Sequence, residues 1–162
     1  MQPTPQTAIL DWVKELPPST MVYPENFFDR LKYVLWRLYT PYHSFFRDTL
    51  LKLGIIHHEE RQSFLLGKLA PGRSLMKLIS FLINQGYGNH FIAWKDEGQL
   101  VSLRLVKNFT YQYHLRIFED GEIRGHYEYT PECHPFLHLQ EKSFEDRHKE
   151  FSDLLRGWII PA

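Results

Sequence analysis

The first half of the chain spaces its apolar residues at intervals of three and four, the period of an α-helix with one buried face. This pattern predicts a short helix over residues 7–16, a longer helix over residues 24–40 and a third helix over residues 42–53. A proline or a glycine follows each of these segments and ends it. We expect the second and third helices to form an antiparallel or angled pair.

The next thirty residues hold one ambiguous segment and one clear helix. Residues 57–69 follow no single period, and we interpret them as a shorter helix that the turn at residues 70–72 closes. Ser74 suits the N-cap of a helix over residues 75–85, and Gly86 suits its C-terminal end. The apolar stripe of this helix is wide enough for a central place in the core.

After Gly88 apolar and polar residues alternate, which is the period of a half-buried β-strand. The predicted strands cover residues 91–94, 100–106, 110–118 and 123–130. Two similar turns, Asp96-Glu97-Gly98 and Glu119-Asp120-Gly121, join them in pairs. Glycine at the third loop position indicates a type I turn followed by a left-handed glycine bulge. We therefore predict two β-hairpins with the same turn geometry.

This turn geometry fixes the register of the second hairpin, because it pairs Phe118 with Glu122 and every second pair then shares one face. A two-residue loop would shift the register by one and mix polar with apolar side chains. The polar face collects residues from both hairpins: His90, Ile92, Trp94, Ser102, Arg104, Gln112, His114, Arg116, Arg124, His126 and Glu128. The opposed pairs on it are His114 with His126 and Arg116 with Arg124.

A last helix over residues 143–158 begins with a sequence that resembles a capping box. We expect it to cover the apolar face of the sheet, so that the polar face turns toward solvent, a cleft or the N-terminal helices. The chain is predicted to be one α+β domain over residues 1–162: an arm with a short helix (1–22), a helical half (24–86), an antiparallel four-stranded sheet of two consecutive hairpins (90–130) and the closing helix (143–158).

Composition and charge narrow the classes of function. The chain has 162 residues, in which 19 lysines and arginines balance 19 acidic residues. It therefore lacks the broad positive field that is typical of nucleic-acid-binding proteins. A single cysteine, Cys133, excludes an intrachain disulfide. The sequence contains neither a signal peptide nor an apolar run long enough to cross a bilayer. We expect a cytoplasmic protein with no membrane partner, and nucleic acid is not favoured.

The polar face of the sheet is the first candidate site. Like charges directly opposite each other are unfavourable unless something neutralises them, and a small anionic or phosphate-containing ligand would do so. The predicted ligand-binding residues are His90, Arg104, Gln112, Arg116 and Arg124. Alternatively, His114 and His126 act as acid and base, oriented by Glu128, in hydrolysis of a phosphodiester or ester. A face that is merely solvated or salt-bridged is the plain alternative.

A second group of polar residues follows the last predicted strand. Glu132, His134 and His138 are of the types that bind zinc, and His126, Glu128 and Cys133 lie near them in the sequence. Their spacing matches no tight metal-binding signature. We therefore expect no cofactor unless folding brings a divalent metal such as zinc to these residues.

Three classes of function remain open. Binding of a small anionic ligand is the preferred interpretation, and a hydrolase is the first alternative. The second alternative is a structural or protein-interaction module, including a homo-oligomer, that uses exposed tyrosines, Trp12 or Trp158. The sequence contains none of the common nucleotide-binding or serine-hydrolase motifs, which counts against those classes. No other motif decides whether the protein is an enzyme.

Overall fold

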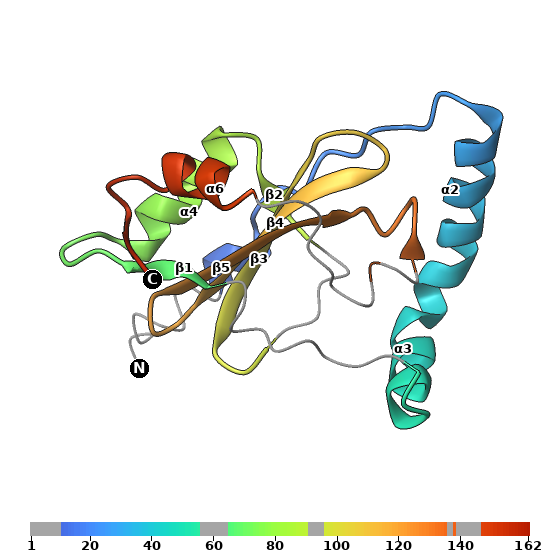
Figure 1. The fold of residues 1–162 in the computed structure, drawn as a ribbon, viewed down its shortest axis with the longest axis horizontal. Helices are drawn as coiled ribbons and strands as arrows, with labels where there is room; N and C mark the ends of the chain where they lie inside the picture. The colour runs from blue at the N-terminus through green and yellow to red at the C-terminus, as the bar shows by residue number, and fades with distance from the viewer. Residues whose placement is uncertain (1–10, 56–64, 91–95, 136–137, 139–146) are drawn as a thin grey trace.

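A six-stranded antiparallel sheet forms the middle of the molecule (Figure 1). The computed structural model describes residues 11–55, 65–90, 96–135, 138 and 147–162. In their spatial order the strands are β2 (Gly88–Asn89), β3 (Gln99–Val106), β4 (Tyr111–Phe118), β5 (Glu122–Tyr129), β1 (Leu65–Leu69) and β6 (Ile159–Pro161). The predicted α+β class with an antiparallel sheet is confirmed, and the predicted number of four strands is wrong.

Two of the strands that the sequence pattern did not reveal, β1 and β6, extend the sheet beyond β5. β1 lies within residues 57–69, for which we expected a helix, and residues 56–64 lie outside the described residues. β1 pairs with β5 on one side and with β6 on the other. These strands have five and three residues, too few to display a clear alternation. These two segments are extended because each pairs with an edge of the sheet. Without this pairing, backbone N–H and C=O groups along that edge would have no partners.

The predicted register of the second hairpin is confirmed. In the β4–β5 pair, His114 lies opposite His126 and Arg116 lies opposite Arg124. Gly121 has a φ of 84°, the left-handed conformation that a glycine bulge requires. The turn therefore aligns polar side chains with polar side chains across the two strands.

The first hairpin is described only in part, since residues 91–94 lie outside the described residues. Just before them, β2 pairs with β3, with Asn89 opposite Leu103. The N–H of His90 then donates to the carbonyl of Ser102 at 2.9 Å. This bond aligns His90 with Ser102, in agreement with the predicted sharing of one face.

The hydrophobic core lies between the apolar face of the sheet and two helices, α4 (Leu75–Asn84) and α6 (His148–Leu154), which Figure 1 shows on the same side of the sheet. Leu78, Ile79 and Leu82 of α4 are fully buried, as expected for a central helix. The ring of Phe151 in α6 meets the ring of Tyr113 edge-on, with centroids 5.4 Å apart.

The closing helix is shorter than predicted. Residues 155–158 form turns, with Gly157 at a φ of 76°, and the chain then enters β6 instead of remaining helical to residue 158. The predicted start at Ser143 lies outside the described residues. Coverage of the apolar face by the whole of residues 143–158 therefore stays a prediction.

Two further helices, α2 (Phe27–Tyr39) and α3 (His43–Lys52), lie apart from α4 and α6, with the sheet between them (Figure 1). Asn26 caps α2 by accepting a hydrogen bond from the N–H of Asp29. A 3₁₀ turn, η1 (Thr40–Tyr42), joins the two helices, and α3 continues beyond α2 instead of folding back antiparallel to it. No helix in the described part of the chain has the length and apolar character needed to cross a membrane.

Candidate metal centre

The polar face of the sheet is buried. Its central side chains, His114, His126 and Glu128, are 2%, 3% and 1% exposed. Ser19 and His138, which lie outside the two hairpins, contact side chains of this face. We expected this face to meet solvent, a cleft or the N-terminal helices. The burial of these three side chains excludes solvent at their positions.

Each predicted anion-binding arginine has an acidic partner in the same chain. The pairs are Arg104 Nη2 with Glu132 Oε1 at 2.8 Å, Arg116 Nη1 with Asp96 Oδ2 at 3.8 Å, and Arg124 Nη2 with Glu122 Oε2 at 2.7 Å. Arg104, which is fully buried, also donates to Ser19 and to Gln112. These carboxylates supply the negative charge that we expected a bound anion to supply.

Glu128 is the centre of a cluster of histidines. Its Oε2 lies 2.9 Å from Nε2 of His126 and 3.3 Å from Nδ1 of His138. Its Oε1 lies 3.0 Å from Nδ1 of His114 and accepts a hydrogen bond from Nε2 of Gln112 at 2.7 Å. Both carboxylate oxygens are thus engaged, and the carboxylate is held in one orientation.

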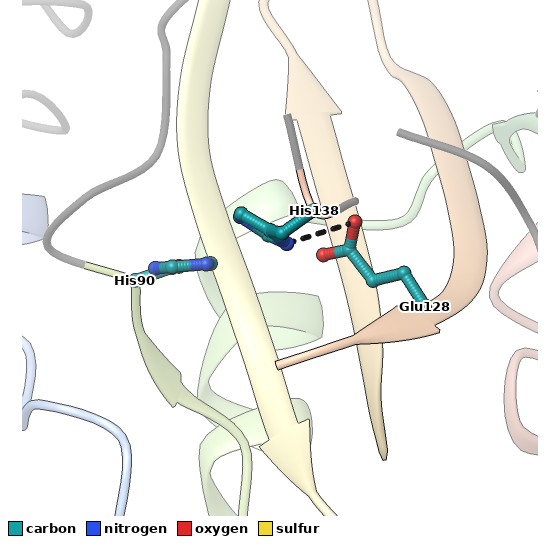
Figure 2. Close-up of side chains that lie close together, drawn as sticks. All are labelled: His90, Glu128 and His138. Carbon is teal, nitrogen blue, oxygen red and sulfur yellow. Dashed lines mark ion pairs between the residues drawn. The ribbon is translucent and has the colours of Figure 1, made fainter. Parts of the chain in front are cut away.

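Three separate parts of the chain contribute to one side of this cluster. Strand alternation in β5 places Glu128 on the polar face, His90 directly follows β2, and His138 belongs to the segment after β5. Figure 2 shows that the three side chains point toward one another. Nδ1 of His138 also lies 3.0 Å from the carbonyl oxygen of Tyr129, which fixes the plane of the imidazole.

Two sets of three donors in this cluster are close enough to hold a metal ion. The first set is His90, Glu128 and His138, and the second is His114, His126 and Glu128. Within each set, one donor atom from each residue lies within 4.8 Å of the others. Both sets share Glu128, so its carboxylate would be a ligand in either.

The electrostatics of the cluster favour neutral imidazoles at His90 and His114 and an anionic carboxylate at Glu128. Burial lowers the pKa of His114 to about 4, although the neighbouring Glu128 by itself would raise it. Burial, together with the charge of Arg104, holds the pKa of His90 well below its usual value. Burial alone would raise the pKa of Glu128, but His138, His126 and His114 hold it well below its usual value.

This donor set matches the chemistry of a borderline divalent ion. Zn²⁺ binds imidazole nitrogen and carboxylate oxygen at about 2.0–2.2 Å, so neighbouring donors of a tetrahedral site lie about 3.3 Å apart. The donor atoms of His90, Glu128 and His138 lie within 4.8 Å of one another, a range that includes this spacing. Nδ1 of His138 faces the carbonyl oxygen of Tyr129 and so carries a proton, which leaves Nε2 with the lone pair that a metal would use. Metal ligands must also be deprotonated, which is the state favoured here for His90 and Glu128.

Of the three metal ligands proposed from the sequence, the structure brings only His138 into the cluster. The carboxylate of Glu132 pairs with Arg104 instead. The ring of His134 packs against the ring of Tyr129, with centroids 4.5 Å apart. Glu132 is buried on the polar side of the sheet, where it pairs with Arg104, whereas His134 is partly exposed.

Two neighbours of the cluster were not predicted. Ser19 approaches from the N-terminal segment and accepts a hydrogen bond from Arg104. His43 lies at the start of α3, where burial, followed by the charge of His138, lowers its pKa to about 4. No periodicity or spacing in the sequence relates these two residues to the hairpins, because tertiary packing alone brings their elements to the polar face.

Comparison of the chain with protein-family models, with curated protein sequences and with solved structures finds no match.

Proposed function

We propose that this domain binds a divalent transition-metal ion of the Zn²⁺ class through Glu128, His90 and His138. One observation carries the proposal: an oriented, buried carboxylate lies within 4.8 Å of imidazole nitrogens from two other segments of the chain. A divalent cation would neutralise the buried carboxylate and use the lone pairs of neutral imidazoles.

His114 and His126 act in this proposal as positioning residues for Glu128. Nε2 of His114 lies 2.6 Å from Ser102 Oγ, and its Nδ1 lies 3.0 Å from Glu128 Oε1. His126 contacts the other carboxylate oxygen. Partners of this kind orient a metal ligand and raise the affinity of the site.

The surroundings of the cluster favour an ion over a larger ligand. Of the donors, His90 and Glu128 are almost completely buried and His138 is 11% exposed, and the fully buried Arg104 pairs with Glu132. A cation of atomic size needs no open groove, whereas an anionic ligand would meet the buried carboxylate of Glu128.

The proposal is tested by isothermal titration of the full chain with ZnCl₂ after removal of bound metal with a chelator. The wild type is expected to bind one Zn²⁺ per chain. Glu128→Gln, which keeps the shape of the side chain, and His138→Ala should abolish this binding. His114→Gln and His126→Gln should bind with the same stoichiometry but about 10- to 100-fold more weakly.

Two histidines serve as matched controls. His148 is exposed on α6, and His134 packs against Tyr129 away from the cluster. His148→Ala and His134→Ala should bind Zn²⁺ as the wild type does. Equal affinities for the wild type and Glu128→Gln would contradict the proposal, provided that circular dichroism shows both to be folded.

Hydrolysis is a second candidate, favoured by the number of donors. A zinc ion held by Glu128, His90 and His138 would keep a position open to water, and it would activate that water as a nucleophile. The acid–base roles of His114 and His126 stay predictions. Turnover of bis(4-nitrophenyl) phosphate or 4-nitrophenyl acetate should require Zn²⁺ and disappear in His126→Ala, whereas equal rates with and without metal would exclude this candidate.

Anion binding by the arginines also stays a prediction. Because each arginine already has an acidic partner, a phosphate ion would have to displace a carboxylate. Titration of the chain with inorganic phosphate, compared with Arg116→Ala and Arg124→Ala, tests it.

A further inference from the structure

The face of α2 that points away from the domain is a continuous apolar ridge. Six large side chains form it, each between 49% and 74% exposed, and we call them the α2 ridge: Phe27, Phe28, Leu31, Val34, Leu35 and Leu38. Phe45 of α3 is also 67% exposed. Apolar side chains exposed in such a row mark an interaction surface more often than isolated exposed residues do.

The opposite face of α2 already has its contacts with the rest of the domain. Trp36 is 5% exposed, and Nζ of Lys32 lies 3.8 Å from Sγ of Cys133, in the segment that follows β5. Positions 32 and 36 are one helical turn apart, and the ridge lies around the far side of the helix. The ridge is therefore not a displaced part of the core.

The spacing of the ridge suits a second helix. Phe28, Leu31, Leu35 and Leu38 follow one another at intervals of three, four and three residues. This alternation produces the narrow seam along which two α-helices pack side by side. A partner that presents an α-helix with the same seam would fill it.

The area of the ridge matches one half of a dimer interface. At about 200 Å² for a fully exposed large side chain, the six side chains together expose about 740 Å². This exceeds the roughly 300–600 Å² of the largest apolar patch on a typical monomer, and it is close to the approximately 800 Å² that each partner buries in a stable complex.

We infer that α2 mediates homodimerisation, with the α2 ridge of one copy packed against the α2 ridge of a second copy. A two-fold symmetric interface needs a surface that is complementary to itself, and a uniform apolar seam on a helix meets this requirement. The metal cluster contributes nothing to this interface. The proposal of dimerisation therefore does not depend on the proposal of metal binding.

The test is sedimentation velocity of the full chain between about 1 and 200 μM. The wild type is expected to sediment as a dimer, and the double variant Leu31→Glu/Leu35→Glu as a monomer throughout, with a dissociation constant raised at least 100-fold. Met76→Glu is the matched control, because Met76 is 40% exposed on α4, and it should stay dimeric. Unchanged circular dichroism of the double variant shows that the loss is not unfolding.

A second measurement does not depend on charged substitutions. Oxidation of Leu35→Cys should produce a disulfide-linked dimer, whereas the buried Cys133 of the wild type should not. A wild type that is monomeric at 200 μM would overturn the inference. The inference would also be overturned if the wild type were a monomer that binds lipid vesicles and if Leu31→Glu/Leu35→Glu abolished this binding. The ridge would then bind a membrane surface instead of a second copy.

Discussion

At the scale of single residues, the most consequential contact beside the cluster is the ion pair of Arg104 with Glu132. The guanidinium donates from Nη1 and Nη2 to both carboxylate oxygens, at 3.1 and 2.8 Å, and the two side chains are 0% and 6% exposed. Burying two charges is expensive, and only their mutual attraction and further hydrogen bonds offset the cost. Removing one partner should therefore be far worse than removing both.

Glu132→Gln is expected to lower the free energy of unfolding by about 3–5 kcal/mol, because it leaves the buried charge of Arg104 uncompensated. The double variant Arg104→Met/Glu132→Leu should be closer to the wild type. Urea denaturation measures both. The exposed pair of Lys149 and Asp153 is the control, and Asp153→Asn should leave the free energy of unfolding nearly unchanged. A loss as small for Glu132→Gln would contradict the buried-charge explanation.

The buried histidines make the metal-free protein sensitive to acid. In the folded state the pKa of His114 is lowered to about 4, and in the unfolded chain it is near the ordinary value of 6.5. The unfolded chain therefore takes up the proton first as the pH falls. This contribution to stability is complete above about pH 6.5 and is lost progressively toward pH 4.

Urea denaturation in the presence of a chelator should accordingly give a lower free energy of unfolding at pH 5 than at pH 7. The difference should shrink in His114→Gln, which cannot take up the proton, and should persist in His148→Ala, whose ring is on the surface of α6. A free energy of unfolding that is the same at both pH values would show that burial of His114 is not linked to folding.

At the scale of elements, the sheet depends on a close approach that only glycine allows. Gly67 of β1 has a φ of 153°, and a Cβ added to it would lie 2.2 Å from the carbonyl oxygen of Ile160 in β6. A side chain at this position would collide with backbone, which cannot move without separating the two strands. The edge of the sheet therefore depends on this residue.

Gly67→Ala should destabilise the protein by more than Gly98→Ala. Gly98 also has a left-handed φ, 71°, but a Cβ there would meet nothing within 4 Å, so its replacement costs only about 1–2 kcal/mol of conformational strain. Hydrogen exchange of the amides of β6 in Gly67→Ala should show local opening in addition to the loss of stability. Equal losses of stability in the two variants would show that the cost comes from the backbone angle φ alone and not from the contact with Ile160.

At the scale of the whole molecule, the sheet separates two environments. Its apolar face packs on Leu78, Ile79 and Leu82 of α4, whereas its polar face holds a buried carboxylate among histidines. A metal that binds the folded state alone should stabilise the whole domain, since the donors meet only after β2, β5 and the segment after β5 have come together.

Excess Zn²⁺ is therefore expected to raise the melting temperature. At a free concentration 100 times the dissociation constant, binding adds about 2.7 kcal/mol to the free energy of unfolding. Differential scanning calorimetry with Zn²⁺ and with a chelator measures the shift. Glu128→Gln should melt at the same temperature under both conditions, and a Zn²⁺-dependent shift in that variant would locate the binding elsewhere.

The sequence by itself determined the local structure and the two faces of the hairpins. Helical spacing revealed α2, α3 and α4, and the third-position glycine Gly121 predicted the register that puts His114 opposite His126. Such features depend on residues close together in the chain, whose conformations follow from periodicity and from the φ that glycine permits. The assignment of acid–base and ligand residues to one face followed from the same register.

Tertiary structure decided everything that depends on distant segments. It added β1 and β6 to the sheet, joined His138 and His90 to Glu128, and paired Arg104 with Glu132. It also turned the α2 ridge outward. A sequence shows that a stripe is apolar or that a face is polar, but not what covers it, because burial is decided by which elements pack together across the whole chain.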